Sequence, residues 1–321
     1  MDIGVLIIGL GQIGMGYDLC LESETHVYSH CRAFNLHSSF SLLGGVDPDE
    51  KNRAGFENEY QFPAYKNLKL ALKELEPDLV IISAPTTYHL DLLQAVLKFS
   101  DPKAILCEKP LSYDLEDARL MVDLCKEREI QLFVNYMRRS DPAVIEINDK
   151  LNSGKIATPV RGVAWYSKGL MHNGSHLFNL LEYWLGTMVK FEIISPGRSL
   201  ENGDKEPDVK VYFEKGEIVF LSLEEENYSH YTIELMAPNG MLRYEMAGHQ
   251  ATWQPVIQNP VFKLNKSITV EQKIIETNMN KFQYNVASQV EMAFKKEKYF
   301  LSSGEDALRT IESLSAILGK V

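Results

Sequence analysis

An apolar run followed at once by a glycine-spaced turn is the feature that most constrains how this chain folds. The run is Ile3–Ile8, and the turn after it is Gly9-Leu10-Gly11-Gln12-Ile13-Gly14. The order predicted is strand, tight turn and helix start, the context in which G-x-G-x-x-G indicates a dinucleotide site. Gly9 would allow the turn, Gly11 would let the backbone approach a pyrophosphate, and Gly14 would let helix and strand pack closely. The phosphates would lie at the helix N-terminus, where the dipole favours negative charge. The cofactor-binding residues expected here are Gly9, Gly11, Gln12, Ile13 and Gly14. The alternative is a glycine-rich turn that binds nothing.

The first 140 residues alternate strand patterns with amphipathic helix patterns. The strands expected are 3–8, 41–46, 79–84, 103–107 and 131–136. The amphipathic stretches expected between them include 67–75, 88–98 and 114–128. Short strands rich in Val, Ile, Leu and Phe are typical of a parallel sheet buried on both faces. Residues 1–140 are therefore predicted to form a Rossmann domain with a doubly wound parallel sheet, in the α/β class.

The pattern changes after residue 140. Asp141-Pro142 predicts a helix start, and Gly154 predicts its end. Period-two alternation follows at Val209, Val211 and Phe213, at Val219, Leu221 and Leu223, and at Tyr231, Ile233 and Leu235. Pro238-Asn239-Gly240 marks a turn, and Ser302 with Glu305 suggests a capping box before a last helix that ends near Gly319. Residues 141–321 are expected to form an α+β domain for substrate binding and oligomerisation, with an open, mainly antiparallel sheet.

Composition narrows the function classes. The net charge of −11 over 321 residues argues against a nucleic-acid or anionic membrane surface. No stretch approaches the ~20 apolar residues of a membrane span. The four cysteines, Cys20, Cys31, Cys107 and Cys125, show no C-x-x-C spacing, which favours reduced thiols over a zinc site or a disulfide framework. We expect a cytoplasmic protein without a metal site.

Asp47 stands at the end of the second predicted strand. A carboxylate there can accept hydrogen bonds from the ribose hydroxyls of NAD and would repel the 2′-phosphate of NADP, so NAD is the cofactor expected. The other interpretation is that Asp47-Pro48 caps the next helix.

Asp47 lies 33 residues after Gly14, more than the ~20 that is usual. The excess points to an insertion at Tyr17–Ser29, before a helix that begins near His30. Two interpretations are open: the insertion helps to shape a substrate pocket, or it is a tolerated surface loop.

Glu108-Lys109-Pro110 follows the apolar run 104–107, at the carboxyl end of a predicted sheet strand. Open α/β folds bind ligands at that edge. A lysine desolvated there can exchange the proton of a substrate hydroxyl as hydride moves, so Lys109 is the candidate acid/base. A surface lysine is the simpler alternative.

Four elements occur in order at strand ends: the Gly9–Gly14 turn, Ala84-Pro85-Thr86 with His89, Glu108-Lys109-Pro110, and Asn135-Tyr136-Met137-Arg138-Arg139. Together they resemble the glucose-fructose oxidoreductase, inositol dehydrogenase and MocA (Gfo/Idh/MocA) family. The resemblance implies an NAD(P)-dependent oxidoreductase of a sugar, cyclitol or related polyol, with the lysine as acid/base. It adds Ala84, Pro85, Thr86, His89, Glu108 and Lys109 to the expected cofactor site. It also implies a homodimer or homotetramer formed through the open sheet.

The chain departs from the family pattern at one helix. The family often has Asp-x-Gly-x-His with a further Asp three residues on, whereas this chain has His172, Gly174, His176 and Asn179. The acid/base group could therefore be Lys109 alone, the Lys109–His176 pair, or a pair that involves His172; a buried core residue is the alternative for His176. The i, i+4 spacing of the two histidines does not predict a metal site, because no third ligand is evident.

Several cationic and polar side chains could bind the substrate. The candidates are Tyr136, Arg138, Arg139, Tyr166, Lys168, His172, Asn173 and Asn179. Arginine suits bidentate contact with an anion, which favours a nucleotide-linked or otherwise anionic sugar; salt bridges between the domains are the alternative for Arg138 and Arg139. Two other functions stay open. The chain could recycle bound NAD in a net non-redox conversion, or it could be an NAD-binding regulatory or scaffold protein that has lost catalysis.

Overall fold

The computed structural model describes residues 2–22, 25–201, 203–223, 225 and 227–321. The chain divides into two compact units, Met1–Ser140 with Asn280–Arg309 and Asp141–Met279 with Thr310–Val321. The first break falls where the sequence pattern changes. The domain expected over 141–321 is nevertheless not one piece, because Asn280–Arg309 belongs to the first unit.

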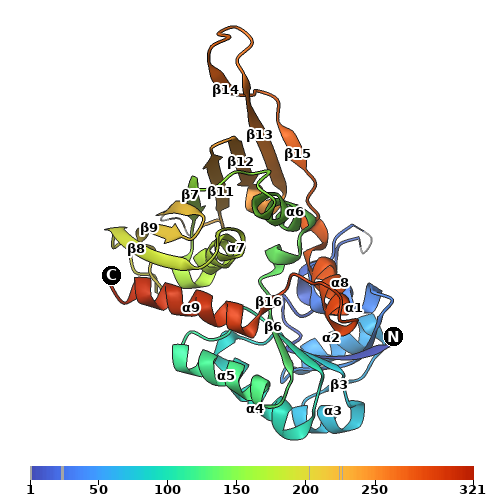
Figure 1. Ribbon diagram of the computed structural model, residues 1–321. Coiled ribbons are helices and arrows are strands. Elements are labelled where there is room, and N and C mark those ends of the chain that lie inside the picture. The colour runs from blue at the N-terminus through green and yellow to red at the C-terminus, as the bar shows by residue number, and fades with distance from the viewer. Residues whose placement is uncertain (1, 23–24, 202, 224, 226) are drawn as a thin grey trace. The chain divides into compact units, whose positions relative to one another are not determined.

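The first unit is built on a seven-stranded sheet (Figure 1), in the order β16-β6-β5-β4-β1-β2-β3. Its strands are β1 Ile3–Ile8, β2 Phe40–Val46, β3 Ala64–Tyr65, β4 Leu79–Ile82, β5 Ala104–Cys107, β6 Gln131–Val134 and β16 Ser302–Ser303. β1 to β6 run parallel, and β16 pairs antiparallel with β6 at the edge. This is the doubly wound order expected, with the carboxyl ends of the strands at one edge. β4 and β6 each end two residues before the predicted limit.

Among its described residues, the α-helices that lie wholly within this unit are α1 His30–Leu36, α2 Glu50–Tyr60, α3 Leu68–Leu75, α4 His89–Phe99, α5 Leu115–Glu127 and α8 Phe282–Phe294. A buried apolar cluster joins Val5 and Ile7 of β1, Phe34 of α1, and Val286 and Val290 of α8. One helix of this core, α8, therefore comes from near the end of the chain. Period-two and period-3.6 patterns show which faces are apolar, but they do not show which distant segment covers them.

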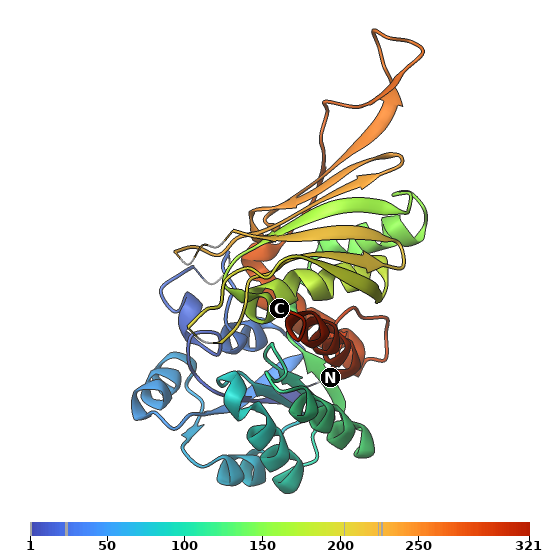
Figure 2. The ribbon, with the colours of Figure 1, turned by 90° about the vertical axis from the view of Figure 1, so that its left-hand side faces the viewer.

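The second unit contains a nine-stranded sheet (Figure 2), in the order β14-β13-β12-β11-β7-β10-β9-β8 with β15 paired to β13. Its strands are β7 Val160–Tyr166, β8 Met188–Ser195, β9 Asp208–Phe213, β10 Gly216–Ser222, β11 Tyr231–Ala237, β12 Gly240–Glu245, β13 Gln250–Gln258, β14 Lys266–Ile268 and β15 Lys273–Ile275. The sheet is mainly antiparallel, as expected, with one parallel pair, β7 with β10. Pro238-Asn239-Gly240 lies at the turn between β11 and β12.

Two helices of this unit are α6 Pro142–Asn152 and α7 Ser175–Leu185. Asp141 caps α6 as predicted, its carboxylate accepting the N–H of Ala143. α7 packs on the sheet through Phe178, whose ring centroid lies 5.5 Å from those of Phe213 on β9 and Phe220 on β10. The opposite face carries ion pairs instead, among them Lys210 with Glu217.

The buried face of β10 differs from the prediction. Val219 and Leu221 were expected inside, but the buried residues are Ile218 and Phe220. Both faces of this strand are apolar at one end, so alternation alone does not choose between them. The choice follows from contact with α7, because a one-residue shift of register exchanges the faces of a strand.

The last helix, α9 Gly304–Leu318, contributes residues to both units. Its capping box lies one residue later than predicted. The Ser303 hydroxyl accepts the N–H of Asp306 at 3.1 Å, and the Asp306 carboxylate accepts the N–H of Ser303 at 3.3 Å. In the described part of the chain, no helix combines the length and apolar character needed to span a membrane.

Candidate functional site

The glycine turn is shaped by close backbone approaches. Gly9 has φ +96°, and a Cβ there would come within 2.7 Å of Ala84 N. A Cβ on Gly14 would lie 2.1 Å from Gly9 O, whereas one on Gly11 would meet nothing within 4 Å. Gly9 and Gly14 are therefore required by the turn itself, and Gly11 leaves open space above it.

The helix expected directly after Gly14 is split. The N–H of Met15 donates to Gly11 O at 2.8 Å, and a 3₁₀ turn at Gly16–Asp18 follows. The N–H groups of His30 and Cys31, at the start of α1, then donate to the carbonyls of Ile13 and Gly14 at 3.0 and 2.9 Å. In an uninterrupted α-helix, Tyr17 would be the donor to Ile13. The extra residues are thus Tyr17–Ser29, the insertion that the spacing indicates.

A cavity of about 850 Å³ opens at the carboxyl ends of β1, β2 and β4. Seven of the predicted cofactor residues line it: Gly9, Gly11, Gln12, Ile13, Asp47, Ala84 and Pro85. The cavity is also lined by residues that were not predicted for it: Tyr17, which begins the insertion, Asn52, Lys66, Tyr88 and Asp91. Because parallel strands end together, residues far apart in the sequence meet at this edge.

The Asp47 carboxylate lies in the wall of this cavity and is only 6% exposed. Its two oxygens accept the N–H groups of Leu10 and Asp49, each at 2.8 Å. Asp47 is not the cap of α2, because Asp49 caps that helix by accepting the N–H of Lys51. Asp47 therefore connects the end of β2 to the glycine turn.

The other residues predicted for the cofactor site do not line the cavity. Thr86 opens a 3₁₀ turn, Thr86–Tyr88, and His89 is fully buried at the start of α4. The two ring nitrogens of His89 lie 2.9 Å from Ala84 O and 3.1 Å from Leu111 O. Burial lowers its pKa. His89 thus joins the loop after β4 to the segment after Pro110, and its contact with a cofactor stays a prediction.

Glu108 and Lys109 follow β5 at the same sheet edge, and neither lines the cavity. One oxygen of Glu108 lies 2.8 Å from His30 Nε2 and accepts the Asn135 amide at 2.6 Å. The Asn135 amide also donates to Gln283 at 3.2 Å. Burial alone would raise the pKa of Glu108, but the bonds from His30 and Asn135 and the charge of Lys109 bring it below its ordinary value. Glu108 is therefore held as a carboxylate.

The predicted anion-binding residues of the first unit are buried. Tyr136 precedes a 3₁₀ turn, Met137–Ser140, which contains Arg138 and Arg139. Arg139 pairs with Asp306 at 2.9 Å, and both residues belong to the first unit, so this is not a bridge between units. In the second unit, the buried Tyr166 hydroxyl donates to Pro207 O at 2.6 Å. Arg139 and Tyr166 thus have structural partners.

Most of the remaining predicted residues lie on one helical stretch of the second unit. Lys168 has a left-handed backbone, φ +63°, and a π-helical segment, Gly169–Gly174, leads directly into α7. His172 and Asn173 are in the π-helical segment, whereas His176 is in α7. The i, i+4 spacing of His172 and His176 therefore spans two helix types. No group of three or more His, Cys, Asp or Glu side chains suited to a metal ion occurs among the residues described.

Two carboxylates hold the start of this π-helical segment. Four successive N–H groups, Gly169–His172, donate to the segment Asp204–Glu206 at 3.1, 2.8, 3.2 and 2.9 Å in chain order. The acceptors are Glu206 Oε1, the Lys205 carbonyl and both Asp204 oxygens. Burial, with the nearby charge of Glu206, raises the pKa of Asp204 despite these bonds. Asp204 was not among the predicted site residues, because it lies about 30 residues from its partners along the chain.

His176 and Asn179 are both buried in α7. The His176 ring meets the Tyr231 ring edge-on, with centroids 5.9 Å apart. The Asn179 amide donates to Thr310 Oγ1 at 3.1 Å, and Thr310 donates to the Glu182 carboxylate at 2.6 Å. Asn179 thus belongs to a buried polar chain within the second unit.

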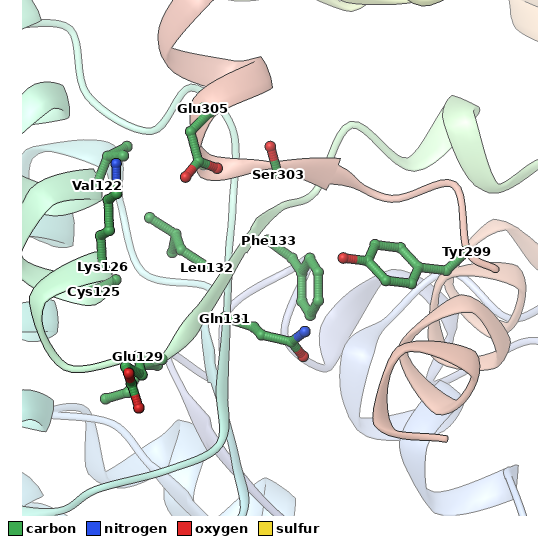
Figure 3. A pocket seen from close by; sticks show the side chains of 12 residues that line it. Val122, Cys125, Lys126, Glu129, Gln131, Leu132, Phe133, Tyr299, Ser303 and Glu305 are labelled. Carbon is green, nitrogen blue, oxygen red and sulfur yellow. The ribbon is translucent and has the colours of Figure 1, made fainter. Parts of the chain in front are cut away.

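A second hollow in the first unit, of about 290 Å³, lies beside β6 and contains no predicted site residue (Figure 3). Its lining mixes charges, since Lys126, Glu129 and Glu305 all line it. Burial and the charge of Glu305 raise the pKa of Cys125 to about 12. The Cys125 thiol is therefore not activated as a nucleophile.

Comparisons with known proteins agree with this arrangement. Residues 3–136 match the family model GFO_IDH_MocA, "Oxidoreductase family, NAD-binding Rossmann fold". D-xylose 1-dehydrogenase [NADP(+)] of Haloarcula marismortui is 35% identical over 83 residues, 26% of this chain and 22% of that protein. The scyllo-inositol 2-dehydrogenase (NAD(+)) of Bacillus subtilis is 28% identical over 144 residues, 39% of this chain and 40% of that protein. The matched segments thus span less than half of these relatives.

Similarity of fold extends over nearly the whole chain. The WlbA dehydrogenase of Bordetella pertussis, solved with NADH and UDP-GlcNAcA, superposes with a TM-score of 0.76 at 16% identity, covering 98% of this chain and 94% of that one. At that identity the likeness concerns the fold alone. Residues 3–136, which contain the glycine turn and Glu108-Lys109-Pro110, thus match the NAD-binding Rossmann domain of the Gfo/Idh/MocA oxidoreductase family.

Proposed function

We propose that this protein is an NAD-dependent dehydrogenase that moves hydride between the nicotinamide and a secondary alcohol of a sugar, nucleotide sugar or cyclitol. The observation that carries the proposal is the shared sheet edge. The cavity formed by the glycine turn and Asp47 opens at the carboxyl ends of β1, β2 and β4, and Lys109 follows β5, the neighbour of β4.

The residues around the cavity fit a dinucleotide. Gly11 leaves space where a side chain would lie, and the volume of about 850 Å³ suits a ligand of that size. The Asp47 carboxylate can accept further hydrogen bonds from ribose hydroxyls and would repel a 2′-phosphate, which favours NAD. Lys66 in the same wall is a cation that works against this preference. NAD, when bound, supplies the hydride acceptor or donor.

Lys109 is proposed as the acid/base residue. A lysine at this edge can take the hydroxyl proton when the alcohol is oxidised and return it in the reverse direction. His176, or His172 in its place, is proposed to assist in the proton transfer. Substrate contacts are proposed for Tyr136, Arg138, Lys168, Asn173 and Asn179. The cations among them suit an anionic, nucleotide-linked sugar, and the WlbA likeness with UDP-GlcNAcA is compatible with that class.

Replacing Lys109 tests the proposal. We expect Lys109→Ala to lower kcat by about 10²–10⁴-fold, the usual contribution of an acid/base group, while NAD affinity changes little. Lys103→Ala is the matched control, because Lys103 is exposed next to the opposite end of β5 and pairs with Asp78. NADH formation is measured over a panel of sugars, nucleotide sugars and cyclitols, with product analysis by mass spectrometry.

Each other outcome has a definite meaning. A fully active Lys109→Ala variant would refute the role of Lys109. Product without net NADH would replace the dehydrogenase with an enzyme that recycles its cofactor. Tight NAD binding with no product over the whole panel would favour a protein that has lost catalysis.

A further inference from the structure

The insertion Tyr17–Ser29 delivers one particular side chain to the interior of the first unit. α1 resumes the hydrogen bonding of the glycine turn at His30, whose N–H donates to Ile13 O at 3.0 Å. Ser29 caps α1 by accepting the N–H of Arg32. His30 is therefore fixed as the first residue of α1, directly after the inserted segment.

A buried carboxylate holds the inner end of the insertion. Asp18 is 0% exposed and accepts the N–H groups of Tyr28 and Ser29 at 2.6 and 2.8 Å, and the Ser29 hydroxyl at 2.7 Å. Arg32 Nε lies 3.7 Å from the same carboxylate. Two N–H donors, a hydroxyl and a guanidinium satisfy this charge, so the start and the end of the insertion are joined.

The His30 ring reaches Glu108. It is 0% exposed, with Nε2 at 2.8 Å from Glu108 Oε1, and Asn135 donates to that same oxygen. Nδ1 of His30 is buried and makes no hydrogen bond with any described residue. Because Glu108 is held as a carboxylate, which can only accept, Nε2 of His30 is the donor in this bond.

Glu108 is coupled to the residue after it. Its second oxygen, Oε2, accepts the N–H of Lys109 at 3.3 Å. The carboxylate thus contacts the Lys109 backbone through one oxygen and His30 and Asn135 through the other. A change at His30 would alter both the direction of the carboxylate and the ease with which it is protonated.

We propose that His30 is a positioning residue for Lys109, acting through Glu108. The insertion Tyr17–Ser29, whose two ends are joined by Asp18, would fix the position of His30. This inference rests on the proposed function, in which Lys109 carries the proton. The insertion would then help to position Lys109 at the carboxyl edge of the sheet. This role differs from the two interpretations that the sequence left open, a wall of the substrate pocket or a surface loop.

The test compares His30→Leu, which removes the donor, with His30→Gln, which keeps an amide donor. For His30→Leu we expect kcat to fall by about 10–100-fold, because a displaced acid/base group loses its alignment, while the Kd for NAD changes by less than about threefold. Without the His30 bond the pKa of Glu108 rises, so the acidic limb of the kcat profile moves to higher pH. His30→Gln should recover most of the rate and the original limb.

His37→Leu is the matched control. His37 is also a nearly buried histidine, at the end of α1, but it lies near Glu291 and Tyr284 and does not contact Glu108. Wild-type kcat and pH profile in His30→Leu, with Lys109→Ala inactive, would overturn the positioning role and leave the proposed function intact. An active Lys109→Ala would instead refute the proposed function. If His30→Leu does not fold, His30→Gln decides, since a tenfold loss in that variant contradicts a role for the donor.

Discussion

At the scale of single residues, Asp47 contacts the glycine turn and also lines the cavity. Its oxygens accept the N–H groups of Leu10 and Asp49, which fixes the glycine turn against the end of β2. The same carboxylate lines the cavity, where each oxygen has a further lone pair for a ribose hydroxyl. Substitution therefore affects both the shape of the turn and the choice of dinucleotide.

Thermal unfolding measures that choice. We expect wild-type protein to be stabilised by NAD at about 100 times its Kd by about 2.7 kcal/mol, several degrees in Tm, and by NADP much less. Asp47→Ser should reduce the NAD shift and narrow the difference between the two dinucleotides, because the repulsion of the 2′-phosphate is gone. Asp49→Ser is the control, since serine also caps helices well. An unchanged NAD-to-NADP difference in Asp47→Ser would remove Asp47 from cofactor selection.

At the scale of elements, the sequence predicted what depends on neighbouring residues. Local apolar runs, caps and spacing predicted β1, β2, β4, β5 and β6, the start of α6 and the insertion, whereas the two-residue strands β3 and β16 were not predicted. The errors arise where distant segments decide. Ile218 and Phe220 of β10 are inside because α7 covers them, and α8 joins the core of the first unit from near the end of the chain.

The candidate site divides in the same way. The glycine turn and Asp47 could be predicted because their positions directly after apolar runs in the sequence identify them. The partners of Glu108 could not, because His30, Asn135 and Gln283 come from three separate segments. Asp204 likewise could not be predicted, since its hydrogen bonds depend on the distant π-helical segment that it contacts.

Asp204 gives a prediction for that element. Asp204→Ala would strand the N–H groups of Met171 and His172, at a cost of about 1–3 kcal/mol each in unfolding free energy. Glu201→Ala, an exposed change in the same loop, is the control and should be neutral. Urea unfolding at neutral pH measures both. Equal stability of Asp204→Ala and wild type would mean that Asp204 does not hold the segment.

The pH dependence has a definite sign. Because burial raises the pKa of folded Asp204, the folded state binds its proton more tightly than the unfolded chain does. This contribution to stability is complete below the ordinary aspartate pKa and is lost as pH rises through the raised value. The neutral Asp204→Asn variant does not titrate at this position. As pH rises from the ordinary aspartate pKa to the raised pKa of Asp204, the unfolding free energy of wild type should therefore fall relative to that of Asp204→Asn.

At the scale of the whole molecule, the second unit carries an apolar surface that a monomer would leave in water. β13 and β14 extend as an arm from the edge of its sheet, visible in Figures 1 and 2. Large apolar side chains along the arm are highly exposed: Val261 75%, Phe262 66%, Leu264 100%, Val270 96% and Ile274 72%. Large exposed apolar patches mark interaction surfaces in soluble proteins. A second copy of the chain is the partner that the resemblance to the Gfo/Idh/MocA family implies.

Light scattering coupled to size exclusion tests this surface. We expect the wild-type protein to have the mass of a dimer or tetramer, and the double variant Phe262→Ser, Leu264→Ser to dissociate on dilution. The two changes remove much of the apolar area that association would bury, at about 25 cal/mol per Å². Leu70→Ser is the control, because Leu70 is a partly exposed leucine of the first unit. A monomeric wild type at micromolar concentration, or an arm variant that keeps the wild-type mass on dilution, would exclude the arm as the oligomer contact.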